Sequence, residues 1–296
     1  MYEPIPYQGP HFVTANGIQL CYDAFGNPTN PPLLLIAGLG MQLISWDEEV
    51  CTLLAERGYW VIRYDNRDVG LSTKFEAAGM PNLLPALQGG DVNAPYLLRD
   101  MAADAVGLLD ALDLDSAHVL GASMGGMIAQ SMAIHFPERV RTLISIMSTT
   151  GAPDLPQPKP EVAMMLLAPA ADSLAAHIQN SLEWAHVLNG PGFPVDEARA
   201  REQAIAAYER SYYPQGTGRQ LAAIFASGSR REALRSLAIP TLVIHGKADP
   251  LVPVAGGIDT AEAIPDAKLW LIEGLGHALP PETWPEAVDA IARHAK

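Results

Sequence analysis

A serine flanked by glycines stands between an apolar strand-like run and a helix-like run. Residues 119–126 read Val-Leu-Gly-Ala-Ser-Met-Gly-Gly, so that Gly121 and Gly125 frame Ser123. Residues 127–134 then carry apolar side chains at the three- and four-residue spacing of a helix. A strand that turns directly into a helix at a serine needs strained backbone angles and neighbours almost without side chains. The pattern therefore predicts a hydroxyl raised above a sheet edge, at a helix N-terminus whose dipole favours negative charge.

Strand-length apolar runs alternate with helical patterns along most of the chain. This alternation predicts an α/β protein with a mostly parallel, twisted sheet and helices on both faces. An opening hairpin is expected at 11–15 and 18–25, because Asn16-Gly17 between them is a strong two-residue turn signal. The further expected strands are residues 33–37, 60–64, 118–120, 142–147, 241–245 and 268–272. The expected helices are residues 46–57, 95–112 (with Pro95 in its first turn), 124–136 and 284–294.

The alternation breaks in the middle of the chain. Residues 151–160 contain four prolines, which predict a stiff, extended linker. Residues 161–236 look helical throughout, and no strand pattern returns until after them. We therefore expect a core made of residues 1–150 and 237–296, with residues 151–236 inserted between two of its strands as a helical cap, or lid.

Composition narrows the class of protein less than the motifs do. The 296 residues are 49% hydrophobic, which is enough for a sizeable core, and the net charge of −14 argues against nucleic acid or an anionic membrane as partner. Cys21 and Cys51 lack metal-ligand spacing and suit a reducing compartment. The N-terminus does not resemble a signal peptide, and no apolar stretch is long enough to span a bilayer. A cytoplasmic protein is expected.

A serine hydroxyl needs a base within hydrogen-bond reach, and the base needs an acid to orient it. His277 is the expected base, because it lies in a glycine-flanked loop directly after the last strand, where open α/β sheets collect reactive groups. Asp249, at the end of the strand before, is the expected acid. Asp154 in the proline-rich linker is its rival, and Glu273 would serve only if its strand ended early. The remaining histidines lie in strand patterns, near the termini, at a helix end or in the cap.

The negative charge that develops on an attacked carbonyl oxygen also needs donors. The turn at the serine supplies the Met124 N–H, and the Leu39 N–H is the expected second donor. Gly38 and Gly40 on either side of Leu39 allow close backbone approach, although an ordinary tight turn explains these glycines equally well.

These segments together resemble the serine α/β-hydrolases over essentially the whole chain. Among capped members the chain most resembles the aclacinomycin methylesterase group, chiefly through Arg-Tyr-Asp-Asn-Arg-Asp-Val-Gly-Leu-Ser at residues 63–72 and Gly-His-Ala-Leu-Pro at residues 276–280. Many members have His-Gly before the oxyanion residue, whereas Ala37 precedes the glycine here and removes a side chain that often supports that loop. Arg67 and Asp68 are expected to brace loops near the site by ion pairing.

The resemblance and the triad together imply a carboxylic-ester hydrolase that works through an acyl-enzyme on small to medium apolar esters. No metal or organic cofactor is implied, and the expected partner is a small-molecule ester; a homo-oligomer is left open. C–C bond hydrolysis or acyl transfer could use the same triad. A hydrolase-like ligand receptor is the alternative from a different class.

The cap is expected to select the substrate. Met164, Met165 and Trp184 suggest an apolar pocket, since methionine adapts to varied shapes. The alternative is that the methionine pair belongs to the internal packing of the cap.

Overall fold

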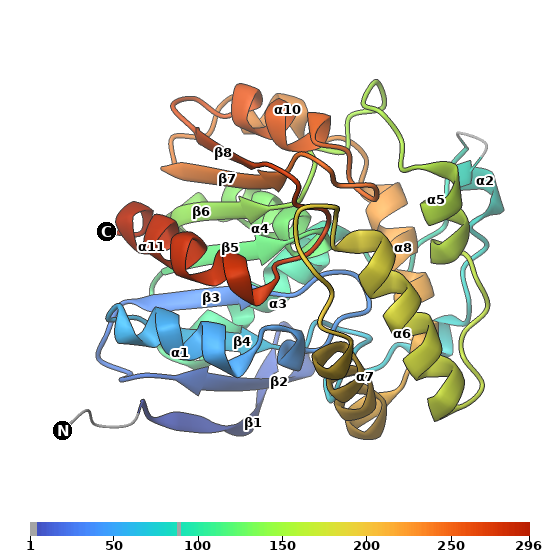
Figure 1. Cartoon of the computed structure of the whole chain (residues 1–296). Coiled ribbons are helices and arrows are strands. Elements are labelled where there is room, and N and C mark those ends of the chain that lie inside the picture. Colours follow the sequence, from blue (N-terminus) through green and yellow to red (C-terminus); the bar gives the residue numbers. More distant parts are fainter. Residues whose placement is uncertain (1–4, 88–89) are drawn as a thin grey trace.

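The computed structural model describes residues 5–87 and 90–296, so part of the N-terminal segment that we judged unlike a signal peptide lies outside it. One eight-stranded sheet runs through the molecule in the order β1-β2-β4-β3-β5-β6-β7-β8 (Figure 1). β1 pairs antiparallel with β2 and β2 antiparallel with β4, whereas all other pairs are parallel. The strands are β1 (Tyr7–Ala15), β2 (Ile18–Phe25), β3 (Pro32–Ile36), β4 (Trp60–Tyr64), β5 (Ala117–Ala122), β6 (Val140–Ile146), β7 (Thr241–Gly246) and β8 (Lys268–Ile272).

The opening hairpin has the turn that its sequence predicts. Asn16 and Gly17 both have positive φ, at 49° and 77°, as the type I′ hairpin turn requires. Asn and Gly tolerate these angles best, so this pair sets the register of β1 on β2.

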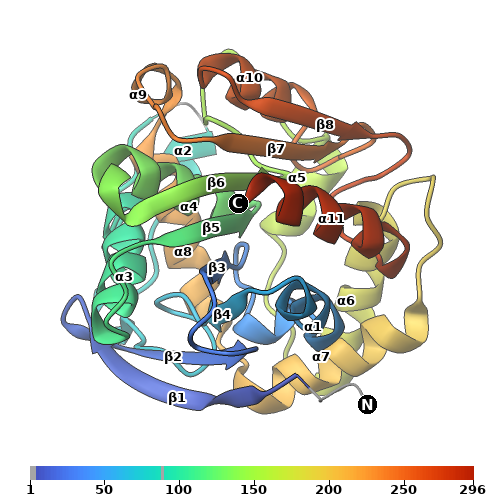
Figure 2. The same ribbon diagram turned by 90° about the vertical axis from the view of Figure 1, so that its left-hand side faces the viewer.

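Helices cover both faces of the sheet (Figure 2). α3 (Leu98–Ala111) and α4 (Met124–His135) pack on one face, and α1 (Glu48–Glu56) and α11 (Trp284–His294) pack on the other. The side chains of β3 alternate between the two cores: Leu34 and Ile36 join the first, Leu33 and Leu35 the second. A parallel strand that is buried on both faces reads as a continuous apolar run, which is why β3 stands out in the sequence.

The structure corrects the expected start of the helix at residues 95–112. α3 begins at Leu98, so Pro95 is not in its first turn. The Asp100 carboxylate accepts a hydrogen bond from the Leu97 N–H at 2.8 Å, and this side chain sets the helix start in place of proline. α10 (Ala255–Ala263) was not expected at all, because its two adjacent glycines weaken the helical pattern.

Five helices lie between β6 and β7 in the sequence, and Figure 1 shows that most of them gather beyond the carboxyl ends of the parallel strands. They are α5 (Pro160–Leu166), α6 (Leu174–Leu188), α7 (Glu197–Ser211), α8 (Pro214–Ser227) and α9 (Arg231–Leu234). The short α2 (Leu84–Leu87) lies in the same region. The 3₁₀ helices are η1 (Leu43–Ser45), η2 (Glu76–Ala78), η3 (Pro137–Arg139) and η4 (Pro281–Thr283). Within the described ranges, none of the helices has the length and apolar character needed to cross a bilayer.

Candidate active site

Ser123 occupies a sharp turn between β5 and α4. Its φ of 56° and ψ of −121° lie in a region that side-chain-bearing residues rarely adopt. Two hydrogen bonds hold this conformation: the Ser123 N–H donates to Ile146 O at 2.9 Å, and the Ser148 hydroxyl donates to Ser123 O at 2.8 Å. The end of β6 and the residues directly after it thus stabilise a strained serine, and strained residues cluster at functional positions.

The two glycines of the pentad are required by close backbone approach. A Cβ on Gly121 would collide with the carbonyl oxygen of Gly125, and a Cβ on Gly125 would collide with the carbonyl oxygen of Ile36. β5, α4 and β3 therefore meet backbone to backbone around Ser123. This contact sets the start of α4 directly behind the serine.

Asp249 and His277 meet at the neighbouring strand ends. Asp249 follows β7 and His277 follows β8, and Nδ1 of His277 lies 2.7 Å from Oδ2 of Asp249. Oδ1 accepts the Leu251 and Val252 N–H groups at 2.9 and 2.8 Å, which fix the carboxylate. Burial of the Asp249 carboxyl raises its pKa, but His277 and His245 outweigh that effect and hold the pKa at about 2. An ionised acceptor thus faces the imidazole.

His245 is a member of this cluster that the sequence did not reveal. Its fully buried ring places Nε2 2.8 Å from Val252 O and 3.3 Å from Oδ2 of Asp249. A carbonyl oxygen can only accept, so Nε2 carries the proton and Asp249 faces two imidazole rings. From its place in a strand pattern, we expected His245 to be packed or hydrogen-bonded there. Its spacing of four residues from Asp249, across the end of β7, is the signal that could have placed it beside the acid.

Ser123, Asp249 and His277 all follow strands of the parallel part of the sheet, and the carboxyl ends of those strands form one edge. In the described part of the chain the acid and the imidazole are joined directly, whereas no hydrogen bond joins the serine hydroxyl to the imidazole. Catalytic hydrogen bonds are often long or poorly aligned in the absence of a substrate and tighten only around it.

The expected oxyanion loop lies against the serine. A Cβ on Gly38 would be 3.4 Å from Cβ of Ser123. Among the described residues, neither the Leu39 N–H nor the Met124 N–H donates a hydrogen bond to the protein. Both amides are thus available to a ligand oxygen, as an oxyanion hole requires.

The neighbouring charged residues brace loops, as expected. Arg67 pairs with Asp104 at 2.6 Å, and Asp68 pairs with Arg219 of α8 at 2.8 Å. The rival acid Asp154 is 67% exposed and pairs with Arg231. It makes no contact with a histidine among the described residues.

The expected pocket residues are less enclosed than the triad. Met164 is 74% exposed, and Met165 and Trp184 are half-buried. The buried side chain of α5 is Val162, whereas the side chain of Met164 is largely exposed. The sequence did not single out Val162.

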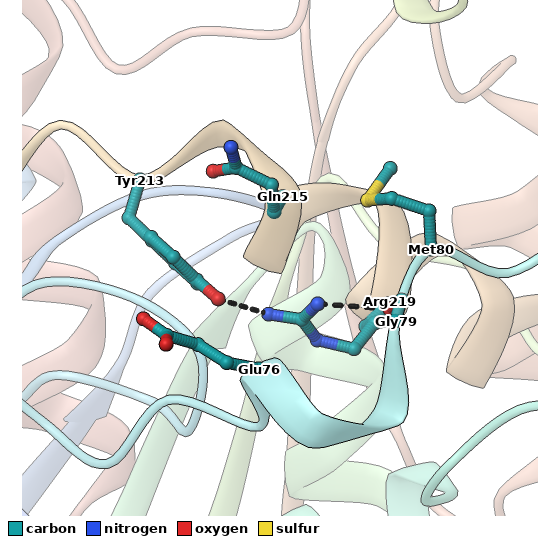
Figure 3. A pocket seen from close by; sticks show the side chains of 6 residues that line it. All are labelled: Glu76, Gly79, Met80, Tyr213, Gln215 and Arg219. Atoms are coloured by element: carbon teal, nitrogen blue, oxygen red, sulfur yellow. Dashed lines mark hydrogen bonds between the residues drawn. The ribbon is translucent and has the colours of Figure 1, made fainter.

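A cavity of about 260 Å³ lies between α8 and the segment around η2 (Figure 3). Its lining residues are Glu76, Gly79, Met80, Tyr213, Gln215 and Arg219. Arg219 donates to the Tyr213 hydroxyl at 2.7 Å and to Gly79 O at 3.0 Å, and its charge is already paired with Asp68. The arginine therefore serves to hold the fold together at this cavity.

A mostly parallel sheet, a strained serine between strand and helix, and an aspartate–histidine pair at the following strand ends are the features of an α/β-hydrolase. The chain matches the alpha/beta hydrolase fold family model over residues 31–282. It is 31% identical to a rhodomycin D methylesterase, DauP, of Streptomyces sp. (strain C5), over 96% of this chain and 97% of that one. It is 28% identical to 3-oxoadipate enol-lactonase 2 of Acinetobacter baylyi, over 95% and 96%. A solved structure of a meta-cleavage product hydrolase from Pseudomonas fluorescens superposes with a TM-score of 0.77 at 20% identity, covering 96% of each chain.

The chain belongs to the alpha/beta hydrolase fold family. The resemblance to the methylesterase group that the sequence motifs indicated is confirmed by the similarity to DauP. The structural similarity to the meta-cleavage product hydrolase concerns the fold alone.

Proposed function

We propose that this protein is a serine carboxylesterase whose triad is Ser123, His277 and Asp249. The single observation that carries the proposal is the 2.7 Å hydrogen bond between Asp249 and His277, at the sheet edge where Ser123 is held in a strained turn. Two relatives add support from their names. One is a methylesterase and the other an enol-lactonase, and a lactone is a cyclic ester.

The reaction follows from the roles of these groups. Ser123 Oγ attacks the ester carbonyl carbon while Nε2 of His277 takes its proton, and the bond at Nδ1 to Asp249 stabilises the resulting imidazolium. The Leu39 and Met124 N–H groups donate to the oxyanion of the tetrahedral intermediate. His277 returns the proton to the leaving alcohol, and water then releases the acyl group by the same steps in reverse.

Residues 151–236 form the cap in this proposal and set the substrate. Their helices α5–α8 lie beyond the strand ends that carry the triad (Figure 1). Met164, Met165 and Trp184 contribute an apolar lining, which suits small to medium apolar esters.

The proposal is tested with short p-nitrophenyl esters and with methyl esters of apolar acids. Wild type should turn over both, and Ser123→Ala should lose about 10⁴-fold or more in kcat while staying folded. Ser131→Ala, at a buried serine within α4, is the control and should keep full activity. Turnover that survives Ser123→Ala, or binding without turnover in wild type, would refute the proposal; the latter result would favour a ligand receptor.

A further inference from the structure

Gln220 is a fully buried side chain that joins the inserted helix α8 to the expected oxyanion loop. Its Oε1 accepts the Gly40 N–H at 2.8 Å, and its Nε2 donates to Arg67 O at 2.8 Å. The side-chain amide therefore hydrogen-bonds through both its oxygen and its nitrogen, to the loop of Gly40 and to the loop of Arg67. A buried amide with both ends bonded to backbone specifies one arrangement of these loops, because any other arrangement leaves buried polar groups unpaired.

The loop that Gln220 contacts is a tight turn around Leu39. The Met41 N–H donates to Gly38 O at 3.2 Å and closes the turn, and Gly40 has a φ of 68°, as the third residue of a type II turn requires. Gly38 O belongs to the same peptide group as the Leu39 N–H, so the closing bond orients that N–H. Gln220 fixes the next peptide group, Leu39–Gly40. Without Gln220 the central peptide loses its side-chain anchor, the turn can open, and the closing bond that orients the Leu39 N–H is lost.

The support at the other end of Gln220 is rigid. The Arg67 guanidinium is held by both carboxylate oxygens of Asp104, at 2.6 Å each. α8 itself packs so closely on the core that a Cβ on Gly216 would collide with the backbone oxygen of Asp68. Ala37, directly before the turn, has no polar side chain, and its carbonyl oxygen accepts from Nδ2 of Asn66 at 3.1 Å. The turn is therefore held by side chains from outside its own segment.

We propose that Gln220 is a positioning residue of the oxyanion hole: by anchoring the Leu39–Gly40 peptide it keeps the turn closed, and the closed turn holds the Leu39 N–H toward the substrate oxygen. The inference rests on the proposed function. It gives α8 a role in the chemical step in addition to covering the site. Because the contact matters when charge develops on the oxygen, its loss should affect the transition state more than substrate binding.

The test replaces Gln220 by methionine, which has similar length and no hydrogen-bonding amide. Loss of a whole oxyanion donor costs about 10²–10³ in kcat, so a misplaced donor should cost about 10- to 100-fold, with KM changed less than about threefold. Affinity for trifluoromethyl hexyl ketone should fall in parallel, because addition of Ser123 Oγ to its carbonyl carbon, with the proton passing to His277, creates an oxyanion. Affinity for methyl hexyl ketone should not change.

Gln42→Met is the matched control. Gln42 is also buried and lies in the same β3–α1 connection. Its side-chain amide donates to Ala207 O and Ser211 O of α7, at 2.6 and 3.0 Å, and not to the backbone of Gly40. It should lower the melting temperature while keeping kcat within about threefold. Equal loss of kcat in both variants would assign the effect to general docking of the helices and overturn the inference.

The outcomes separate the two proposals. An inactive wild type, or activity that survives Ser123→Ala, refutes the esterase proposal. A Ser123-dependent enzyme in which Gln220→Met keeps full kcat and full trifluoromethyl ketone affinity refutes only the role of Gln220. If Gln220→Met does not fold, Gln220→Asn replaces it. This amide is one methylene too short to reach both loops, so kcat should fall with KM unchanged, and an unchanged kcat would overturn the inference.

Discussion

Oδ2 of Asp249 lies 2.7 Å from Nδ1 of His277, although the two residues are 28 positions apart in the chain. β7 and β8 are adjacent parallel strands, so the loops that follow them come together. The second carboxylate oxygen is occupied by the Leu251 and Val252 N–H groups. The carboxylate therefore has one orientation, and it directs Nε2 of His277 away from itself as the nitrogen that can accept a proton.

Replacement of Asp249 by asparagine tests this relationship. We expect kcat for p-nitrophenyl esters to fall by about 10⁴-fold, because an amide can select the wrong imidazole tautomer. Circular dichroism should show an intact fold. Asp154→Asn should leave kcat unchanged, since Asp154 is exposed and paired with Arg231. The opposite ranking of the two variants would move the acid to the loop after β6.

The strain at Ser123 predicts a gain in stability at the expense of activity. At a φ of 56° and a ψ of −121°, glycine avoids the steric conflict of a side chain. Ser123→Gly should therefore unfold with a free energy about 1 kcal/mol higher than Ser123→Ala, measured by urea titration. Both variants should be inactive, which separates strain from chemistry. If Ser123→Gly were less stable than Ser123→Ala, the backbone at residue 123 would not be strained.

Removal of one partner of the ion pair between Asp68 and Arg219 should strongly lower the free energy of unfolding. Both side chains are almost completely buried, and the carboxylate accepts two hydrogen bonds from the guanidinium, at 2.8 and 2.9 Å. Arg219→Met leaves a buried carboxylate without its cation and should cost about 3–5 kcal/mol in free energy of unfolding. Arg235→Met removes an exposed pair with Glu232 and should cost less than about 1 kcal/mol. A similar loss in free energy of unfolding for both variants would contradict a stabilising role of the buried pair.

His118 should make the protein less stable in mild acid. Burial lowers the pKa of His118 to about 4, with a smaller contribution from the charges of Arg141 and His294. As pH falls, the unfolded chain protonates this residue near pH 6.5 and the folded protein only near pH 4. The free energy of unfolding therefore decreases across that window and levels off below it.

Urea titrations of wild type and His118→Gln at pH 7 and pH 4 measure this effect. The difference in free energy of unfolding between the two pH values should be smaller in the variant by roughly 3 kcal/mol, because the contributions of all other groups cancel. An identical pH dependence in the two proteins would mean that His118 titrates normally.

A variant at Met164 tests whether this side chain lines a substrate pocket or belongs to the packing of the inserted helices. Because its side chain is 74% exposed, Met164→Ala should leave the melting temperature unchanged. If it lines the pocket, relative kcat/KM among esters with short and bulky alcohol groups should change by about 10- to 200-fold. Met165→Ala on the same ester panel provides the comparison. An unchanged ranking with a lowered melting temperature would assign the pair to packing.

Local patterns in the sequence determined much of this protein. The limits of β4, β8 and α11 match the apolar periodicity, and the hairpin at Asn16-Gly17 and the turn at Ser123 follow from angles and contacts that glycine permits. These features depend on residues a few positions apart, so a single sequence carries them. Even the expected site followed from a local rule, because reactive groups collect at the carboxyl ends of parallel strands.

Tertiary structure alone decided which distant side chains support the candidate site. Gln220 meets Gly40 across 180 residues, and Arg219 meets Asp68 across 151. Such contacts have no period in the sequence. They depend on how the inserted helices pack against the core, and a buried amide or arginine finds its partner only when that packing brings two backbones within hydrogen-bond distance.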